Sequence, residues 1–435
     1  MARIAAFQGV HFNPERVPLQ DVIAPPYDVI SPELQETLYA RHPRNIIRLI
    51  LSRAEMGDAS TDDRYTRAAT YLRENLSDGT LVQDDTPGFY EYIQRFAHPL
   101  APEQVCERRA LFVALRLEPY ANGVVLPHEE THSRAKADRL LLMRATGANP
   151  EPIHGLYEDP GGVVAGSLTQ ARRGRAPLLH VRVPVEGAPG DEHVVYYHTD
   201  PCLIGELQEF FAPLRIWIAD GHHRYETALN YQRERGAGDG QYPWDYLLIG
   251  LSAFQDPGLV VLPTHRLVRN VAAERLDALG ALLEEHFDVR SVSVPEARAW
   301  IQQEVPGERR FVLVRPEHAL ALTLRDIAVM DTVAGATHCP AWRQLDVTIL
   351  QFLVLDRALG ISWETLAHTP DVAYTRDAEE AVQQVQSGVF QVACLLQSPT
   401  VTQVRDVAAA GDRMPQKSTF FYPKLWSGLI LRLLS

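Results

Sequence analysis

One polar cluster in the sequence has the residue types of a phosphate-binding turn: Asp220, Gly221, His222, His223 and Arg224. It follows a compact apolar run typical of a strand and precedes a segment with helical spacing. A glycine between strand and helix lets the backbone approach a ligand closely, and the start of the helix favours an anion. Arg224 can offer two N–H groups to a phosphate, and both histidines supply donors near neutral pH. The alternative is a pair of surface histidines at a helix start capped by Asp220.

A second cluster begins at His128, where His128, Glu129 and His132 match the HExxH pattern of zinc peptidases. That pattern requires a helix with a buried apolar face, whereas the residues that follow are mostly polar. Without metal, Glu129 would be a general base and Lys136 a cation for phosphate. We therefore assign no metal ligand, and the remaining alternative is a solvated loop and helix face.

Further candidates lie in four other places in the chain: Asp28, Asp138 with Arg139, His265 with Arg266, and Lys417 with Ser418. Arg139 could neutralise developing negative charge, as could Lys136. Lys417 and Ser418 have residue types that suit phosphate and could close the site from the C-terminal region, but the glycines of a P-loop are missing. A turn residue after two prolines, for Asp28, and a strand end, for His265, are the structural alternatives.

The overall composition narrows the class of protein. At 435 residues the chain is long enough for two or three domains. A net charge of −13 opposes binding to nucleic acid or to an anionic membrane surface. The four cysteines include no CxxC pair, and neither a signal-peptide-like segment nor an apolar run of membrane-spanning length occurs. We expect a cytoplasmic protein with neither nucleic-acid nor membrane partners.

Mixed helices and strands must position these clusters. Both the 128–139 and the 220–224 clusters follow an apolar strand and lead into a helix, and Ser31-Pro32 has the residue types of a helix start. Helices and strands alternate again beyond about residue 270. The pattern predicts a mixed α/β (α+β) fold in three parts: a core at 1–270, an α+β module at 271–365 and a segment at 366–435 that packs back on the core.

Six landmarks together resemble a bacterial and archaeal family known as the domain of unknown function number ten-fifteen, from end to end. They are IAPPYDVIS (23–31), NIIRLI (45–50), LPHEETHSRAKADRL (126–140), IADGHHRYETAL (218–229), DPGLVVLPTHR (256–266) and GDRMPQKSTFFYPKLWSGL (411–429). The positions that match the pattern of that family in the third landmark are His128, Glu129, Thr131, Lys136, Asp138 and Arg139. In that family the second histidine, His132 here, is not a fixed part of the pattern, which argues further against zinc.

A more local resemblance suggests the chemistry. The segment DGHHRYETA is similar to the phosphate-binding segment of ParB-like proteins, sulfiredoxin and free-serine kinases, with Gly221, Arg224 and Ala228 as the matching residues. The resemblance implies a ParB/sulfiredoxin-like nucleotide-binding core with an additional C-terminal α+β module. It also implies a phosphotransferase that uses ATP or ADP with Mg²⁺ and acts on a small hydroxylated metabolite, with serine as one candidate.

In that scheme the residues at 221–224 bind the phosphates, and Glu129 first or Asp220 second accepts the hydroxyl proton. His128 is a further catalytic candidate. Two rival functions stay open. One is a metal-dependent hydrolase that uses the histidines at 128, 132, 222 and 223 with Glu129 as base. The other is a non-catalytic nucleotide-binding regulatory protein of the ParB type.

Overall fold

The computed structural model describes two compact units. Unit 1 comprises Met1–Pro127, Thr131–Val260 and Pro423–Ser435, and unit 2 comprises His128–Glu130 and Val261–Tyr422. The structure describes residues 1–55, 57–59, 63–129, 131, 133–185, 188–236, 238–303, 305–335, 337–366, 369–415 and 417–434. The chain therefore enters unit 2 at two separate places and returns to unit 1 for its last residues.

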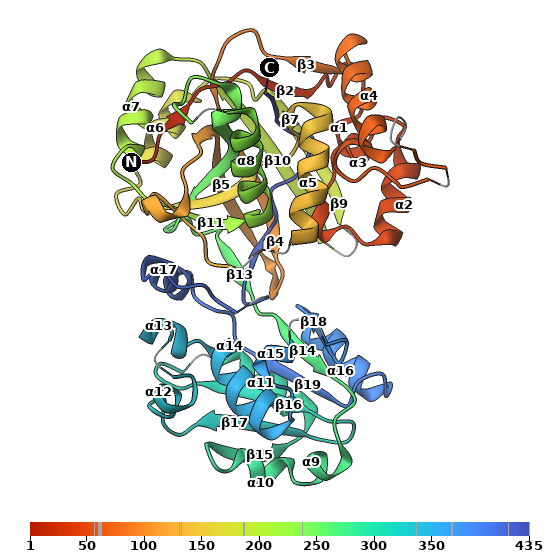
Figure 1. Ribbon diagram of the computed structural model, residues 1–435, viewed down its shortest axis with the longest axis vertical. Coiled ribbons are helices and arrows are strands. Elements are labelled where there is room, and N and C mark those ends of the chain that lie inside the picture. Colours follow the sequence, from red (N-terminus) through yellow and green to blue (C-terminus); the bar gives the residue numbers. More distant parts are fainter. Residues whose placement is uncertain are drawn as a thin grey trace. The chain divides into compact units, whose positions relative to one another are not determined.

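A nine-stranded sheet forms the centre of unit 1 (Figure 1), with the order β6-β11-β8-β12-β5-β4-β10-β9 and β1 paired to β5. The strands are β1 Ile4–Ala5, β4 Phe89–His98, β5 Ala101–Arg116, β6 Val125–Leu126, β8 Ile153–Tyr157, β9 Leu179–Val185, β10 Ala188–His198, β11 Ile216–Asp220 and β12 Tyr246–Ala253. The pairs β11–β6 and β12–β8 are parallel, and the other pairs are antiparallel.

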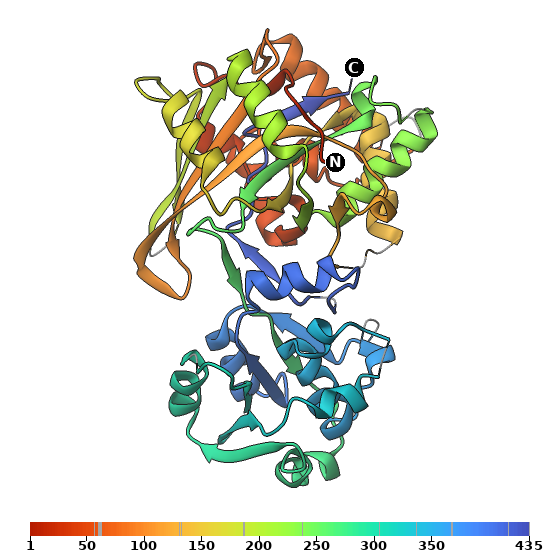
Figure 2. The ribbon, with the colours of Figure 1, turned by 90° about the vertical axis from the view of Figure 1, so that its left-hand side faces the viewer.

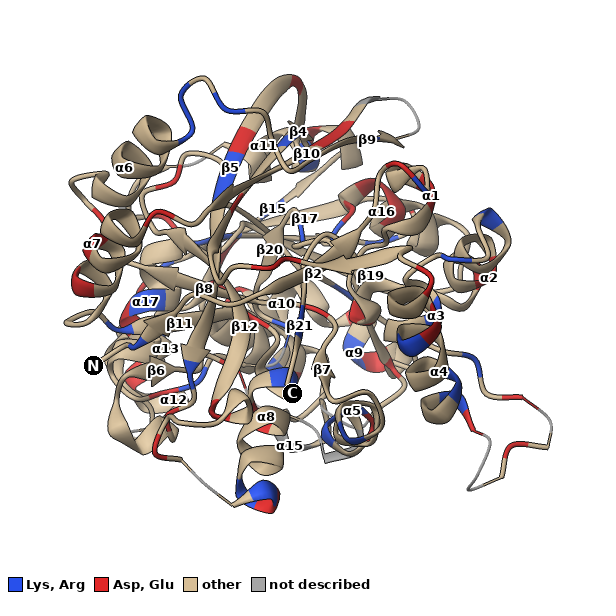
Figure 3. Cartoon of the chain, turned by 90° about the horizontal axis from the view of Figure 1, so that it is seen from above, with Lys and Arg blue, Asp and Glu red and all other residues tan. Residues whose placement is uncertain are grey.

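Alternation along β5 shows why both faces of this sheet are covered. Leu111, Val113 and Leu115 enter one hydrophobic core, and Ala110 and Phe112 enter the core on the opposite face. The first core is completed by α6 Val163–Ala171, α7 Pro201–Phe211 and α8 His222–Arg235, and the second by α1 Leu19–Val22, α2 Pro32–Arg41, α3 Ile47–Ile50 and α4 Arg64–Ser77. Helix α5, Ser133–Thr146, contributes to both cores. Residues of both charge signs occur along α2 and α4 (Figure 3), namely Glu33, Glu36 and Arg41 in α2 and Arg64, Arg67, Arg73 and Glu74 in α4.

A four-stranded sheet, in the order β3-β2-β21-β7, brings the end of the chain into unit 1. Its strands are β2 Gly9–Phe12, β3 Leu81–Gln83, β7 Ala148–Asn149 and β21 Leu431–Leu433. An isolated antiparallel β-bridge also joins Ala24, which follows β2 in the sequence, to Ser427, which precedes β21. The N-terminal loop and the C-terminal segment therefore lie side by side, although about four hundred residues separate them. Unit 1 also contains the 3-10 helices Tyr27–Val29, Tyr120–Asn122 and Pro243–Asp245.

Unit 2 contains an antiparallel six-stranded sheet in the order β15-β17-β16-β19-β14-β18. Its strands are β14 His265–Val268, β15 Phe287–Val292, β16 Arg310–Val314, β17 Ala319–Leu324, β18 Val372–Thr375 and β19 Val392–Leu396. Helices α11 Val294–Gln302 and α16 Ala378–Gln386 pack on this sheet and form one core with it. Strand β13, Val260–Leu262, starts at the boundary of the units and pairs with β20, Phe420–Tyr422. The remaining helices are α9 Ala273–Asp277, α10 Leu279–Leu283, α12 Val329–Val333, α13 Pro340–Arg343, α14 Asp346–Ile349, the π-helix Leu350–Ala358, α15 Trp363–Leu366 and α17 Val401–Ala409.

The mixed α/β class is confirmed, and several element boundaries follow the predicted signals. The side chain of Ser31 caps α2 with Pro32 at its first position. Strand β5 begins well before its apolar second half, because its polar first half forms a long hairpin with β4 (Figure 2). No helix in the described part of the chain has the length and apolar character needed to cross a membrane.

Candidate functional site

The 220–224 cluster lies at a strand-to-helix turn in unit 1. Strand β11 ends at Asp220, Gly221 follows, and α8 begins at His222. Gly221 has a φ of +93°, and a Cβ atom there would lie 2.6 Å from Cγ2 of Ile153 on β8. Only glycine fits, since a side chain would meet both a left-handed backbone and a buried neighbour.

The start of α8 has the electrostatic character of an anion site. Gly221 is the N-cap and has no side chain to cap the first turn, and the helix directs its positive end toward this point. The His222 side chain is buried and that of His223 is half-buried. The first turn of α8 therefore keeps the features that the sequence predicted for phosphate.

Arg224 does not present an open fork to a ligand. Its side chain is 8% exposed, its Nη1 donates to the carbonyl of Pro152 at 2.6 Å, and its Nη2 donates to Oδ2 of Asp220 at 2.8 Å. The guanidinium therefore holds the turn against β8 and neutralises nearby carboxylates, and the role of Arg224 as a phosphate ligand stays a prediction.

Asp220 is held ionised by two cations. Burial alone would raise its pKa, but the charges of Lys424 and Arg224 outweigh this effect and lower the pKa well below the ordinary range. Nζ of Lys424 contacts Oδ1 of Asp220, and the lysine side chain is only 11% exposed. A carboxylate with so low a pKa is a weak base at neutral pH.

Asp28 behaves in the opposite way. It lies in the short helix after Pro26, its side chain is 36% exposed, and its Oδ2 lies 4.0 Å from Nη2 of Arg224. Desolvation by surrounding protein atoms, followed by the negative charge of Asp220, raises the pKa of Asp28. Two carboxylates with opposite pKa shifts thus flank one arginine, an arrangement that separates acid–base work from charge stabilisation.

Glu151 ties the segments of the site together. It is 3% exposed, and its Oε1 accepts hydrogen bonds from the backbone N–H of Tyr27 at 2.9 Å and from Oγ of Ser427 at 3.0 Å. Nη1 of Arg139 lies 3.8 Å from its other oxygen, and the Arg139 guanidinium packs 4.0 Å above the Tyr27 ring. The position of Asp28 therefore depends on residues from four distant segments.

The predicted cations of α5 contact protein carboxylates. Lys136 Nζ lies 2.8 Å from Oε2 of Glu226 on α8, and the Thr131 hydroxyl donates to the same oxygen at 2.6 Å. Arg139 donates to Asp138 and to the carbonyl of Ile50. These residues join α5 to its neighbours, which accounts for their charges without a ligand.

Other predicted residues belong to unit 2. His128 is 1% exposed, its Nε2 lies 2.9 Å from Oγ1 of Thr419, and Thr419 also donates to Oε1 of Glu129 at 3.3 Å. Ser418 is buried and contacts the carbonyl of Pro415, whereas the Lys417 side chain is exposed.

His265 and Arg266 are buried in the sheet of unit 2. Burial, followed by the charge of Arg266, lowers the pKa of His265 to about 4, so the ring is neutral at physiological pH. Arg266 donates to the backbone carbonyls of Thr264 and, at 3.4 Å, Lys417. His132 lies outside the described residues. Over the ranges that the structure describes, no three His, Cys, Asp or Glu side chains form a group that could hold a metal ion.

Lys424 is a site residue that the sequence analysis missed. The chain contains 42 lysines and arginines together, yet only three are lysines, at 136, 417 and 424. All three lie within the landmark motifs. The rarity of lysine was the signal that could have drawn attention to Lys424 beside Lys136 and Lys417.

The candidate site in this mixed α/β unit thus combines a glycine turn at the start of a helix, two carboxylates whose pKa values shift in opposite directions, and a buried lysine. The chain belongs to the family described as protein of unknown function (DUF1015), whose model matches residues 4–348, which confirms the predicted membership. No curated protein matches the chain.

Three solved structures are similar to the chain at low identity. A conserved hypothetical protein from Pyrococcus furiosus is 14% identical with a TM-score of 0.33, over 73% of this chain and 92% of that one. A free serine kinase in complex with AMP is 15% identical with a TM-score of 0.34, over 72% and 86%. SbnI with a C-terminal truncation, from Staphylococcus aureus, is 10% identical with a TM-score of 0.34, over 73% and 85%.

Proposed function

We propose that this protein transfers the terminal phosphoryl group of a nucleotide to the hydroxyl of a small metabolite. The observation that carries the proposal is the pair Asp28 and Asp220, whose pKa values shift in opposite directions beside the Gly221 turn. A hydroxyl acceptor needs a base, and a phosphate needs a helix start with cationic support. Both lie within the described part of unit 1.

Asp28 is the general base in this proposal, in place of Glu129 or Asp220. Its carboxylate is accessible, and its raised pKa makes it a stronger proton acceptor than Asp220, whose pKa is depressed by Lys424 and Arg224. As the acceptor oxygen bonds to phosphorus, its proton passes to Asp28, and the bond to the bridging oxygen of the nucleotide breaks. The ion pairs of Asp220 with Lys424 and Arg224 fix the charges around the base.

The first turn of α8 binds the phosphates. Gly221 lets the backbone approach them closely, and His223 contributes a half-buried side chain in the same turn. Magnesium fits as a partner of the nucleotide, because it needs few protein ligands when phosphate oxygens supply the rest. Asp28 and Asp220, which flank Arg224, are two carboxylates of unit 1 that could contact it. ATP and ADP are both candidate donors, and serine is the first acceptor to test because of the resemblance of DGHHRYETA to free-serine kinases.

Turnover of the full-length protein with ATP or ADP, Mg²⁺ and a panel of hydroxylated acceptors tests the proposal. Asp28→Asn is expected to lower kcat by about 10²- to 10⁴-fold, while the rise in Tm caused by nucleotide is retained. For the wild type, kcat/KM should fall as the pH drops through the raised pKa of Asp28, because the base becomes protonated.

Glu129→Gln is the matched control, since it neutralises the other candidate carboxylate in the same way. Full activity in Asp28→Asn together with loss in Glu129→Gln would move the base to Glu129. The absence of any nucleotide-dependent shift in Tm for the wild type would remove the proposal and favour a metal-dependent hydrolase.

A further inference from the structure

A row of buried polar residues crosses one face of the nine-stranded sheet in unit 1. Gln94 on β4 lies directly opposite Arg108 on β5 and directly opposite His193 on β10, so the three side chains share a face. That face is the one that also presents Phe112 and Ala110 to the core with α1–α4. Further along it, Nε2 of His154 lies 3.0 Å from Oγ of Ser252.

Arg108 is a buried cation, and no carboxylate of the described residues forms an ion pair with it. Its side chain is 1% exposed, its Nη2 contacts Oε1 of Gln94, and its Nε and Nη1 have no hydrogen-bond partner. Burial lowers the pKa of Arg108 to about 10, which still leaves it charged at neutral pH. The negative charges of Asp256 and Asp220 act on this pKa in the opposite direction to burial. Unmet donors of this kind are rare in folded proteins and destabilising unless an acceptor is bound.

His193 presents a second unmet donor on the same face. It is fully buried, and its Nδ1 lies 2.7 Å from the Tyr92 hydroxyl. The Tyr92 hydroxyl also contacts the backbone N–H of Trp426, and in the tautomer in which it donates its own proton to Nδ1 the ring carries its hydrogen on Nε2. Nε2 has no partner. Burial lowers the pKa of His193 to about 3, and the ring is therefore a neutral donor.

The C-terminal segment 423–427 covers these donors. Gln94 Nε2 donates to the carbonyl of Lys424 at 2.9 Å, and the Trp426 ring lies 4.8 Å from the His193 ring. A Cβ atom on Gly250 would lie 2.7 Å from Leu425, so the cover is tight there. A ligand bound by Arg108 and His193 would be enclosed between the sheet and this segment.

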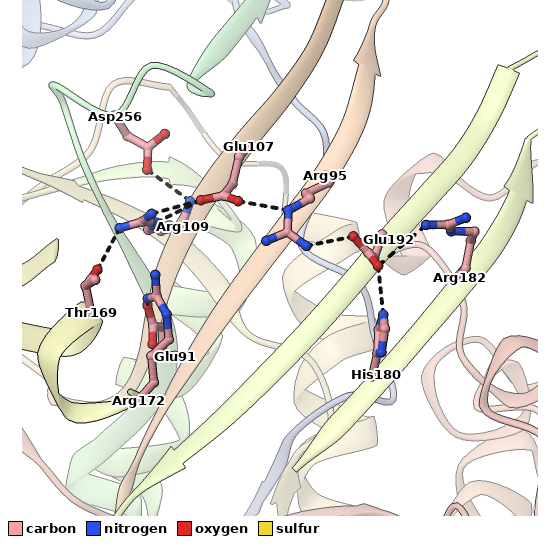
Figure 4. A network of polar contacts seen from close by, with 10 residues as sticks. All are labelled: Glu91, Arg95, Glu107, Arg109, Thr169, Arg172, His180, Arg182, Glu192 and Asp256. Atoms are coloured by element: carbon pink, nitrogen blue, oxygen red, sulfur yellow. Dashed lines mark hydrogen bonds and ion pairs between the residues drawn. The ribbon is translucent and has the colours of Figure 1, made fainter. Parts of the chain in front are cut away.

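This face carries a carboxylate as well as Arg108, because Asp191 lies two residues before His193 on β10 and burial raises the pKa of Asp191 to about 6. Lys424 is paired with Asp220, and burial holds the pKa of His154 low, so that ring is neutral as well. Among the described residues of this face, Arg108 is the cation whose guanidinium keeps N–H groups without an acceptor. The opposite face of the same strands is different, because Arg95, Glu107 and Glu192 pair with one another there (Figure 4). With the Asp191 carboxylate on the same face, a singly charged acceptor suits Arg108 better than a phosphate dianion.

We infer that Arg108 and His193 bind a carboxylate group between this sheet face and residues 423–427. A carboxylate carries one negative charge and enough lone pairs to accept from both side chains. The inference goes beyond the proposed phosphoryl transfer and does not depend on it. The carboxylate belongs either to a free small anion or to a larger metabolite.

Thermal unfolding of the full-length protein in formate tests the inference, with sulfate as the reference salt at equal ionic strength. Unfolding releases any anion carried through purification, so the free anion concentration sets the Tm. We expect the wild-type Tm to rise by roughly 5 °C or more at 100 times the Kd of formate. Arg108→Met should abolish this rise and should melt at or above the wild type in sulfate, because a buried charge whose N–H groups lack acceptors is removed.

Arg432→Met is the matched control. Arg432 is also buried, at 6% exposure, but its nitrogens donate to the carbonyls of Tyr246 and Pro243. This variant should melt below the wild type and keep the full response to formate. His193→Phe supplies a second test should Arg108→Met fold poorly, and it should weaken the response at least tenfold in concentration.

A response to formate that is equal in the wild type and in both Arg108→Met and His193→Phe would overturn the inference, as would no response in the wild type. Glycolate and serine distinguish the two sources of the carboxylate. If either acts at a tenfold lower concentration than formate, the carboxylate belongs to a metabolite. If formate alone acts, the site holds a free anion.

Discussion

Two regions of unit 1 are rich in arginine–carboxylate pairs, and they differ in burial. On β4, β5 and β10, Arg95 bridges Glu107 at 2.9 Å and Glu192 at 2.8 Å (Figure 4), with 44% of the Arg95 side chain exposed. We call this group the surface ladder. Around Glu151, by contrast, the Arg139 and Arg224 side chains are 7% and 8% exposed. We call this group the buried cluster.

The comparison shows that the number of ion pairs in a region does not set their contribution to stability. Exposed pairs contribute at most about 1 kcal/mol each, because water and salt screen them. In the buried cluster each group has given up its hydration, so removing one partner leaves another uncompensated. In the buried cluster, desolvation and neighbouring charges shift the pKa values of Asp28 and Asp220 in opposite directions. We therefore expect function to depend on the buried cluster and not on the surface ladder.

The largest effect is expected for Glu151→Ala. The substitution removes the acceptor of the Tyr27 N–H and of the Ser427 hydroxyl, and it removes a counter-charge of Arg139 and Arg224. The free energy of unfolding should fall by about 3–5 kcal/mol, measured by urea denaturation. Glu107→Ala in the surface ladder is the control and should cost less than about 1 kcal/mol. Equal losses in the two variants would contradict the division.

An intermediate effect is expected for Gly221→Ala, which alters the buried cluster without changing a charge. Forcing a φ of +93° on alanine and placing its Cβ 2.6 Å from Ile153 should cost about 2–4 kcal/mol. The variant should also lose the rise in Tm caused by nucleotide, because Asp220 and the start of α8 move together.

Gly236→Ala, at the other end of α8, is the matched control for that substitution. Gly236 also has a positive φ, of +65°, but a Cβ atom there would meet no atom within 4 Å. It should cost only about 1 kcal/mol and should leave the nucleotide response intact. Urea denaturation and thermal scans with ATP measure both quantities, and a retained response in Gly221→Ala would remove the turn from the proposed site.

Much of the local structure was predictable from the sequence because its signals are local. The Ser31 cap and the glycine between β11 and α8 each depend on neighbouring residues. Two of the family landmarks also contain Asp28 and the 220–224 segment, which identified both as candidate site residues. What these residues contact depended on the fold, since Asp28 is held by Glu151 through the Tyr27 backbone.

The rest was not predictable because it depends on contacts between distant segments. Arg224 has the type and position of a phosphate ligand, yet its guanidinium turns inward to Pro152 and Asp220. Lys424 meets Asp220 only because the last residues of the chain return to unit 1. Arg108 and His193 have no local motif at all, and their unmet donors emerge only from strand register and burial.

The smallest effect is expected for Glu192→Gln in the surface ladder. Hydrogen bonds from Arg95, first, and His180 lower the pKa of Glu192 to about 2, so its stabilisation is present above the ordinary glutamate pKa and is lost as the pH falls through 2. At pH 7 the variant should lose less than about 1 kcal/mol, and even this difference should shrink in high salt. Thermal scans of wild type and variant at pH 7 and at decreasing pH measure it. A loss above about 2 kcal/mol would mean that the ladder is coupled as tightly as the buried cluster, and burial would then not be the property that separates the two regions.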